Sequence, residues 1–477
     1  MKHQSIFLRS FVLTLAVMHA VTISALAAPS DSAKFRVNTP ERYSIDPLGL
    51  TVEGALPGGL VVINGTLKDD EERIWSSRAV FFADAQGQVD VSRAYSTAGT
   101  YTGIDSDGLV WSMLPVALGD EVLQADRRDV APDLPDRPFP EADFSYDIQF
   151  SATFRTKARS GDEVTLEVKQ RLRLDDPTIL RTEIAEAGVH GVLYEPAGEG
   201  PFPTVVWLSG SGGGVSEGRA ALLASNGFAA LALATHNYEG RPDELNRLPL
   251  EYISDAITYA SGLHGQERVG VGGGSRGAEM ALLVASELPD RIGAVVASSP
   301  TNVRWGGCCS EEAKIGYTLG GEDLPAAEIY DHPEAQIETV VYGDAPASMR
   351  ERFLAGMVSG EPAIRAEGIQ APLLLLAGDA DPIWPAALAV ELLTARLNAK
   401  GFEPPLQSHI YQGAGHEIGS AYPFWAMRSV GTLTPHPVDG ILIPKGGTPS
   451  GNASAARDGA RKIIEFFQVH LGDNPSD

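Results

Sequence analysis

Ser275 lies in the segment Gly273-Gly274-Ser275-Arg276-Gly277, which has the spacing G-x-S-x-G. An apolar run precedes this segment and an Ala/Leu-rich stretch follows it, so the serine is predicted to lie on a sharp turn between a strand and a helix. At that position the helix dipole favours a developing negative charge, and the pattern therefore predicts a serine nucleophile. The alternative is a glycine-rich turn that binds phosphate, as in dinucleotide-binding folds. The residues downstream argue against that alternative.

A serine hydroxyl is a weak nucleophile without a base, and candidates for the acid and the base follow in the order typical of hydrolases. Asp379 and Asp381 come just after one apolar run, and His416 lies in a loop of small residues after another. The carboxyl ends of parallel strands meet at one edge of a sheet, so we expect these side chains to lie together. We prefer Asp381 to Asp379, because Asp381 lies further into the loop, nearer to where an imidazole could be held. Asp379 is interpreted as a turn-forming residue. The expected triad is Ser275, Asp381 and His416.

Acyl transfer also requires two backbone N–H donors that stabilise the oxyanion. We expect one from Arg276, the residue after the nucleophile. The second is expected from the glycine-rich loop LSGSGGG, where Ser211 and Gly212 are the candidates. A flexible linker is the alternative for this loop, but a predicted buried strand leads into it and a predicted helix follows.

The elements that must position these residues show two kinds of sequence pattern, one in each part of the chain. Residues 45–184 contain short segments rich in Val, Ile, Phe and Thr between turn residues, which predicts an immunoglobulin-like β-sandwich. Residues 185–477 alternate apolar runs with helix-like stretches, which predicts the doubly wound, mostly parallel sheet of an α/β-hydrolase. An irregular insertion at 301–368 could form a cap over the site. Buried strands are expected from Thr204, Phe228, Glu267, Ile292, Pro372 and Ser408, and a C-terminal helix with Ser454 as its cap.

The N-terminus has the pattern of an export signal. Lys2 and Arg9 precede an apolar stretch from Phe11 to about Ile23, and Ala25-Leu26-Ala27 has the small-x-small pattern of a cleavage site. The apolar stretch is shorter than the roughly 20 residues of a membrane-spanning helix. We therefore expect residues 1–27 to be a cleaved signal peptide rather than a membrane anchor, residues 28–44 to be a linker, and the protein to be periplasmic or secreted.

The chain is acidic, with 37 Lys and Arg against 62 Asp and Glu and a formal net charge of −25. Such a surface repels nucleic acid and anionic lipid. We therefore expect a small-molecule substrate, no nucleic acid, and no stable membrane insertion after signal cleavage; the sequence does not specify an oligomeric state.

The adjacent Cys308 and Cys309 lack the spacing of a metal site, and we expect neither metal nor cofactor. Two thiols are slightly preferred to a strained vicinal disulfide.

Several segments resemble the acyl-CoA thioesterases related to bile acid-CoA:amino acid N-acyltransferase. The catalytic half carries GPFPTVVWLSGSGGG, GGGSRGAEMAL, AGDADPIW and YQGAGHEIGSAYPF, and the β half carries EGALPGGLVVINGTL and WSSRAVFFADAQGQVDVSRA. The resemblance implies a β-sandwich followed by an α/β-hydrolase domain, with Ser275, Asp381 and His416 as nucleophile, acid and base. Because the acyltransferase branch uses Cys as its nucleophile, Ser275 points to hydrolysis of an acyl thioester such as acyl-CoA, or of a related ester.

Other functions stay open at this point. Acyl transfer to an amine such as glycine or taurine would use the same acyl-enzyme, because the acceptor only replaces water. A secreted carboxylesterase without CoA specificity would fit the export signal and the acidic charge. A binding protein on an inactive hydrolase scaffold is the non-enzymatic alternative. Acyl chain length and leaving group are not predicted.

Overall fold

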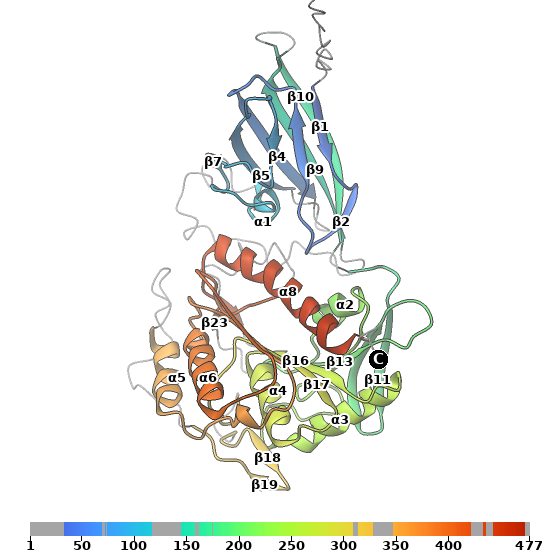
Figure 1. The fold of residues 1–477 in the computed structure, drawn as a ribbon, viewed down its shortest axis with the longest axis vertical. Coiled ribbons are helices and arrows are strands. Elements are labelled where there is room, and N and C mark those ends of the chain that lie inside the picture. The colour runs from blue at the N-terminus through green and yellow to red at the C-terminus, as the bar shows by residue number, and fades with distance from the viewer. Residues whose placement is uncertain are drawn as a thin grey trace, which may run out of the picture.

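The computed structural model consists of a β-sandwich and a larger α/β domain, with helix α8 (Pro449–Leu471) between them (Figure 1). The predicted signal peptide, residues 1–27, lies outside the described part of the chain. The structure describes residues 33–68, 72, 74–116, 145–157, 162–173, 175–308, 313–327, 347–420, 433–435 and 442–472.

The N-terminal domain contains two sheets around one core. The small sheet consists of β1 (Lys34–Val37), β3 (Leu50–Glu53) and β6 (Val89–Asp90). The large sheet has the order β2 (Glu41–Tyr43), β10 (Glu163–Arg173), β9 (Ser145–Arg155), β4 (Leu60–Lys68), β5 (Ile74–Phe82) and β7 (Ala98–Gly99), with β8 (Leu114–Pro115) paired to β5. Buried side chains alternate with more exposed ones along β4, β5 and β9, as a sheet with one face on a core requires.

Both predicted boundaries of this domain need correction. Strands β1 and β2 lie inside the segment 28–44 that was expected to be a linker. Strand β11 (Leu180–Glu186) crosses the expected boundary at 184/185, because it pairs along its whole length with β12 (Val189–Glu195) in the sheet of the second domain. Six of its seven residues are exposed, so β11 carries no apolar run that would have assigned it to that sheet.

The second domain confirms the predicted α/β-hydrolase fold. Among the described residues its sheet has eight strands in the order β11-β12-β14-β13-β16-β17-β20-β21. The strands from β14 to β21 run parallel, and β12 is antiparallel to both of its neighbours. The parallel strands are β13 (Thr204–Leu208), β14 (Ala229–Leu233), β16 (Val269–Gly274), β17 (Ile292–Ser298), β20 (Leu373–Gly378) and β21 (Leu406–Tyr411).

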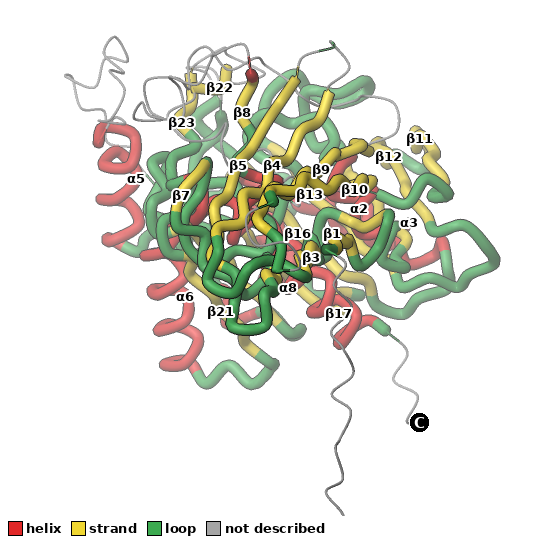
Figure 2. The backbone as a smooth tube through the Cα atoms, turned by 90° about the horizontal axis from the view of Figure 1, so that it is seen from above, coloured by secondary structure: helices red, strands yellow, loops and turns green. Residues whose placement is uncertain are grey.

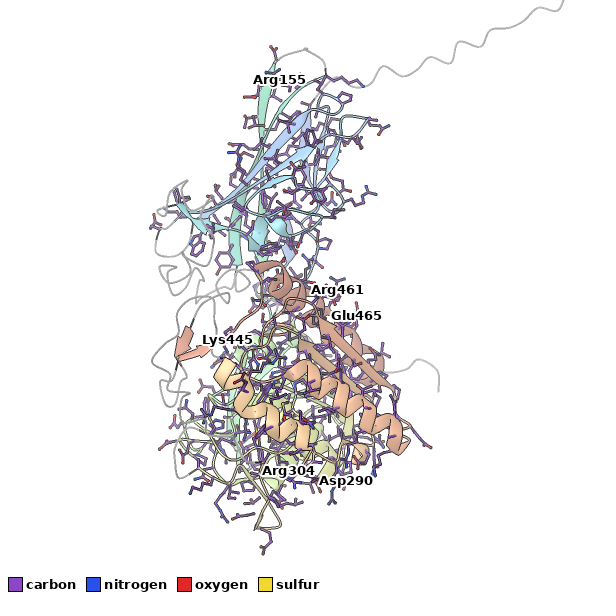
Figure 3. All side chains as sticks on the ribbon, turned by 90° about the vertical axis from the view of Figure 1, so that its left-hand side faces the viewer. Arg155, Asp290, Arg304, Lys445, Arg461 and Glu465 are labelled. Atoms are coloured by element: carbon purple, nitrogen blue, oxygen red, sulfur yellow. The ribbon has the colours of Figure 1, made fainter. Side chains whose placement is uncertain are left out.

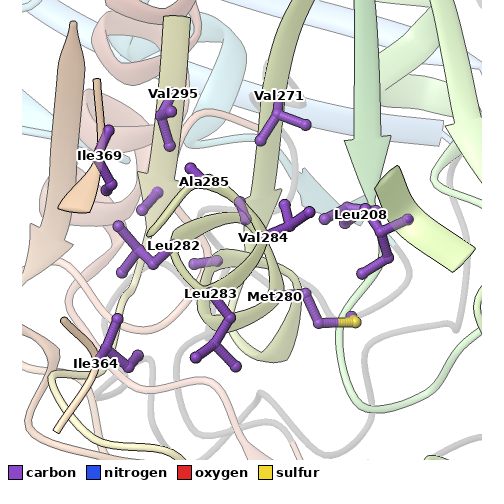
Figure 4. Close-up of a cluster of buried hydrophobic side chains, with 14 of the residues drawn as sticks. Leu208, Val271, Met280, Leu282, Leu283, Val284, Ala285, Val295, Ile364 and Ile369 are labelled. Atoms are coloured by element: carbon purple, nitrogen blue, oxygen red, sulfur yellow. The ribbon is translucent and has the colours of Figure 1, made fainter. Parts of the chain in front are cut away.

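The central strands of this sheet are buried, whereas the edge strand β21 is largely exposed. Every residue of β13, β14, β17 and β20 is buried, as expected for a parallel sheet covered on both faces. The expectation that the run at Ser408 forms a buried strand is wrong, because β21 is an edge strand with four exposed residues. Figure 4 shows the core around α4 (Arg276–Glu287), where Leu282, Val284 and their neighbours pack under β16 and β17.

The helices pack against both sides of the sheet and at its ends. Thr448, rather than Ser454, caps α8: its hydroxyl accepts the N–H of Gly451 at 3.1 Å, with Pro449 in the first turn. Helices α5 (Ala347–Ser359) and α6 (Ala386–Lys400) lie together on one side of the α/β domain (Figures 1 and 2). The other helices of the described residues are α1 (Gly108–Trp111) in the sandwich, and α2 (Glu217–Ala224), α3 (Leu250–Leu263) and η5 (Ala366–Gly368) in the α/β domain.

The expected insertion at 301–368 is partly built into the domain core. Trp305 and Tyr317 are each 1% exposed. Its short strands are β18 (Tyr317–Leu319) and β19 (Glu322–Asp323), and β18 pairs with β15 (Leu248–Pro249). A second short pair, β22 (Leu433–Pro435) and β23 (Leu442–Pro444), precedes α8. Whether part of the insertion forms a cap stays a prediction.

Cys308 is disulfide-bonded, so the preference for two thiols is wrong. Its N–H donates to the carbonyl of Leu245 at 2.9 Å, and its side chain packs against the core. Cys309 lies outside the described residues. In the described part of the chain, we find neither a helix with the length and apolarity to span a membrane nor a metal-binding group of three His, Cys, Asp or Glu residues.

Candidate active site

Ser275 lies on a strained turn between β16 and α4, with φ 58° and ψ −123°. A Cβ on Gly273 would lie 2.4 Å from the carbonyl oxygen of Gly277, and a Cβ on Gly277 would lie 2.3 Å from that of Leu208. Both distances are too short for any side chain, which explains the two glycines of the G-x-S-x-G segment. A positive φ at a residue other than glycine costs on the order of 1–3 kcal/mol and persists where the surrounding structure enforces it.

Hydrogen bonds fix the backbone of Ser275, whereas its hydroxyl makes no helix-capping hydrogen bond. Its N–H donates to the carbonyl of Ser298 at 2.9 Å, and its own carbonyl accepts the N–H of Ala278 at 2.9 Å. Arg276 is the first residue of α4, and the first N–H groups of a helix have no acceptor within the helix. The turn therefore presents a hydroxyl and a helix amino end at the same place.

Asp381 and His416 form a buried pair. Nδ1 of His416 lies 2.7 Å from Oδ2 of Asp381, and the two residues are 6% and 1% exposed respectively. Oδ1 of the carboxylate accepts the N–H of Ile383 at 2.9 Å, which fixes its orientation. Because an ionised carboxylate only accepts hydrogen bonds, Nδ1 carries the proton and Nε2 is left as the basic nitrogen. Asp379 accepts the N–H of Gly413 at 2.7 Å instead.

The end of β17 joins the serine turn to the histidine loop. Ser298 accepts the N–H of Ser275, and the hydroxyl of the next residue, Ser299, donates to the carbonyl of His416 at 2.6 Å. The indole N–H of Trp384 donates to the carbonyl of Ser299 at 3.1 Å. Ser275 Oγ and His416 Nε2 are not hydrogen-bonded in the described structure, and such contacts commonly tighten only when substrate binds. Sequence reasoning missed Ser299, although its position after a buried strand was a signal.

The glycine-rich loop after β13 approaches the serine. A Cβ on Gly210 would lie 3.6 Å from Cβ of Ser275. Nε2 of His236, which is 1% exposed, lies 2.8 Å from the carbonyl oxygen of Ser211. The N–H of a trans peptide points away from its carbonyl, so the N–H of Gly212 points away from His236. His236 follows β14, the neighbour of β13, but it precedes the candidate acids in the chain, and sequence reasoning gave it no role at the site.

The side chain of Arg276 is buried in a polar cluster below the turn. Its guanidinium lies 2.8 Å from the carboxylate of Glu279, and it donates to the carbonyl of Gly306 at 2.5 Å. Glu279 also accepts the N–H of Trp305 at 2.7 Å, and the guanidinium carbon lies 5.5 Å from the ring centroid of Tyr317. Burial raises the pKa of Glu279 to about 7, against the opposing effect of the Arg276 charge. Sequence reasoning assigned a role only to the backbone N–H of Arg276.

An aromatic series connects the insertion to the histidine. The ring of Trp384 meets that of His416 edge to face, with centroids 5.9 Å apart. Phe353 of α5 contacts both Trp384, at 5.7 Å, and Trp305, at 4.9 Å. The insertion therefore packs against the residue that supports the imidazole ring.

The chain matches known proteins over both domains. Residues 46–175 match the family region described as "Acyl-CoA thioester hydrolase/BAAT N-terminal region", and residues 248–473 match "BAAT / Acyl-CoA thioester hydrolase C terminal". "Acyl-coenzyme A thioesterase 1" of Rattus norvegicus is 29% identical, with 90% of this chain and 94% of that protein covered. "Acyl-coenzyme A thioesterase 2, mitochondrial" of the same organism is 28% identical, with 89% and 86% covered. "Acyl-coenzyme A amino acid N-acyltransferase 2" of Mus musculus is 28% identical, with 91% and 97% covered. The chain belongs to the acyl-CoA thioester hydrolase/BAAT family.

Proposed function

We propose that the protein is a serine hydrolase that cleaves acyl thioesters such as acyl-CoA, or related acyl esters, through an acyl-enzyme on Ser275. The observation that carries the proposal is the buried Asp381–His416 hydrogen bond of 2.7 Å, in a loop that Ser299 joins to the strand end bonded to the strained turn of Ser275. The similarity to proteins named acyl-coenzyme A thioesterases supports the substrate class.

In the proposed reaction, Nε2 of His416 removes the proton of Ser275 as Oγ attacks the acyl carbonyl. Asp381 keeps the imidazole in the required tautomer and stabilises its positive charge. The backbone N–H of Arg276 and that of Gly212 or Ser211 stabilise the tetrahedral oxyanion, assisted by the amino end of α4. The C–S or C–O bond of the substrate then breaks, and the imidazolium protonates the departing thiolate or alkoxide.

The second half of the reaction regenerates the enzyme. His416 now removes a proton from water, whose oxygen attacks the acyl carbonyl of the serine ester. A second tetrahedral intermediate collapses, the bond to Ser275 Oγ breaks, and the proton held by His416 returns to the serine. The products are a carboxylic acid and the thiol or alcohol, with no cofactor consumed.

Replacing Ser275 tests this proposal directly. Ser275→Ala should lower kcat with a fatty acyl-CoA and with an aryl ester by at least about 10⁴-fold, because no nucleophile remains. Labelling by a fluorophosphonate probe should disappear as well, while the thermal unfolding profile remains that of a folded protein. Turnover within tenfold of wild type would exclude Ser275 as nucleophile.

Acyl transfer to an amine is the second candidate function. The observation in its favour is the 28% identity to a protein named N-acyltransferase. Products formed from an acyl-CoA in the presence of glycine or taurine distinguish the two reactions: an amide conjugate supports transfer, and free acid alone supports hydrolysis. Paired oxygen-ester and CoA-thioester substrates of increasing chain length would show whether CoA is required.

We also propose that the protein is exported, on the basis of the pattern in residues 1–27. Cleavage after Ala27 would leave Ala28 as the first residue. Mass spectrometry of the N-terminal peptide from the extracytoplasmic fraction should find this terminus. An intact Met1 in protein recovered only from the cytoplasm would contradict the proposal.

A further inference from the structure

Helix α8 is shared between the two domains and lies between them (Figures 1 and 3). Ala453, near its beginning, is 6% exposed and is part of the core of the β-sandwich. Further along the helix, Ile463 and Phe467 are buried in the core of the hydrolase domain. Helix α8 therefore contacts the sandwich near its beginning and the hydrolase domain along its second half.

One face of α8 fixes the backbone around His416 through Asn452, which is 6% exposed. The side-chain oxygen of Asn452 accepts the N–H of Gly415 at 2.8 Å, and its side-chain nitrogen donates to the carbonyl of Gly446 at 2.9 Å. The N–H of His416 donates to the carbonyl of Lys445 at 2.9 Å. Asn452 thus links Gly415, the residue before His416, to Gly446, the residue after Lys445.

The same face leaves no space between the helix and the histidine loop. A Cβ on Gly451 would lie 2.2 Å from the carbonyl oxygen of Gly413, and a Cβ on Gly459 would lie 2.9 Å from the nitrogen of Gly419. The N–H of Gly419 donates to the carbonyl of Ala455 at 3.0 Å. The loop is therefore in contact with α8 both before and after His416, and a displacement of the helix displaces the loop.

The opposite face of α8 is anchored in the β-sandwich. Arg457 forms a hydrogen-bonded ion pair with Asp107, and its guanidinium lies 3.7 Å from the carboxylate of Asp105. The other oxygen of Asp107 accepts a hydrogen bond from Arg42 at 2.8 Å, with the two side chains 3% and 2% exposed. Ala453 lies one helical turn before Arg457 and therefore on the same face. The helix is held by buried groups of the sandwich and not by a surface ion pair alone.

We infer that Asn452 and Arg457 are positioning residues, through which the β-sandwich holds the loop of His416 at the correct distance from Ser275. This inference rests on the proposed function of the triad. The rate of general-base catalysis depends steeply on geometry, and a misplacement of about 1 Å can lower a rate by about 10²-fold. The sandwich thereby contributes to catalysis without supplying a group to the triad.

The first experiment compares Asn452→Ala with wild type. We expect kcat with an aryl ester to fall about 10–100-fold while KM changes less than about twofold, because substrate contacts are unchanged. The rate of fluorophosphonate labelling should fall by a similar factor, since labelling uses the same base. Both rates are measured well below the unfolding temperature of the variant, so that loss of folded protein does not contribute.

The second experiment tests the anchor on the other face. Arg457→Ala should lower kcat about 5–50-fold with little change in KM, and Arg457→Lys, which retains the charge, should recover most of the loss. Arg461→Ala is the matched control, because Arg461 is an exposed arginine one turn further along α8 (Figure 3) and should leave kcat unchanged. In the double variant of Asn452 and Arg457, the two losses should be less than multiplicative, since both act through α8.

The outcomes separate this inference from the proposed function. Activity in Ser275→Ala would refute the triad itself. If Ser275→Ala is inactive but Arg457→Ala keeps kcat within twofold of wild type, the triad stands and the coupling to the sandwich is wrong, even if the variant unfolds at a lower temperature. An increase of KM at constant kcat in Asn452→Ala would also overturn the inference, because it would indicate a role in substrate binding.

Discussion

The two domains use their strands in different ways. In the sandwich, buried positions alternate with more exposed ones along β4 and β5. On the open face, polar side chains of β9 and β10 pair with one another, as Thr153 does with Thr165 and Arg171 with Asp147. In the hydrolase domain, β13, β17 and β20 are buried at every position, as expected for a sheet covered on both faces. The functional candidates Ser275, Asp381 and His416 accordingly all lie just beyond strand ends. A sheet covered on both faces confines chemistry to its carboxyl edge.

The largest effect is expected at this edge, where two neighbouring acids differ in their partner. Asp381→Asn should lower kcat about 10³–10⁴-fold, because an amide cannot hold the required imidazole tautomer. Asp379→Asn is the matched control: its carboxylate accepts the N–H of Gly413, and kcat should change less than about threefold. Steady-state kinetics of both variants decide the assignment, and a larger loss in Asp379→Asn would reverse it.

The next effect concerns the glycines that permit the serine turn. Gly277→Ala places a methyl group 2.3 Å from the carbonyl oxygen of Leu208 and should lower the free energy of unfolding by about 3 kcal/mol or more. In Gly274→Ala the nearest atom would be 4.0 Å away, so the cost should be below about 1 kcal/mol. Chemical denaturation measures both values. Equal stabilities would mean that the strand end can relax around the added carbon.

A smaller, pH-dependent effect is expected from the buried Glu279. Its pKa is raised by burial to about 7 from 4.5 in the unfolded chain, so the native state keeps a proton that the unfolded state releases. Wild type should therefore lose about 1–3 kcal/mol of stability, relative to Glu279→Gln, between pH 5 and pH 8. Urea unfolding at the two pH values checks this. A difference that is constant with pH would show that Glu279 is ionised throughout this range.

The smallest effect is expected on the open face of the sandwich, where Arg171 pairs with Asp147 at 2.8 Å. The hydrogen bond from Arg171 lowers the pKa of Asp147 to about 2, so its contribution is present above pH 4 and is lost as the pH falls through about 2. The carboxylate is 35% exposed, and solvent screening limits the loss in Asp147→Asn to below about 1 kcal/mol at pH 7. Unlike Arg457→Ala, this variant should leave kcat unchanged. A twofold or larger fall in kcat would show that the sandwich affects catalysis through more than α8.

Much of the fold and part of the site could be predicted because their causes are local. The apolar runs at Thr204, Ile292 and Pro372 form buried strands at the expected places. The short approach distances at Gly273 and Gly277 explain why the segment around Ser275 was recognisable. Strand β11 was missed for the same reason, since an exposed edge strand carries no apolar run.

The amino-acid pattern alone specifies the class of fold, the serine turn and the order of serine, acid and histidine, because steric limits and apolar periodicity act between near neighbours. The folded arrangement of the whole chain set which acid meets His416, which side chains surround Arg276, and the contact of Asn452 with Gly415. It also joined Arg457 to Asp107, which is 350 residues away in the chain. Such hydrogen bonds form between single side chains brought together by packing, and no spacing in the sequence records them.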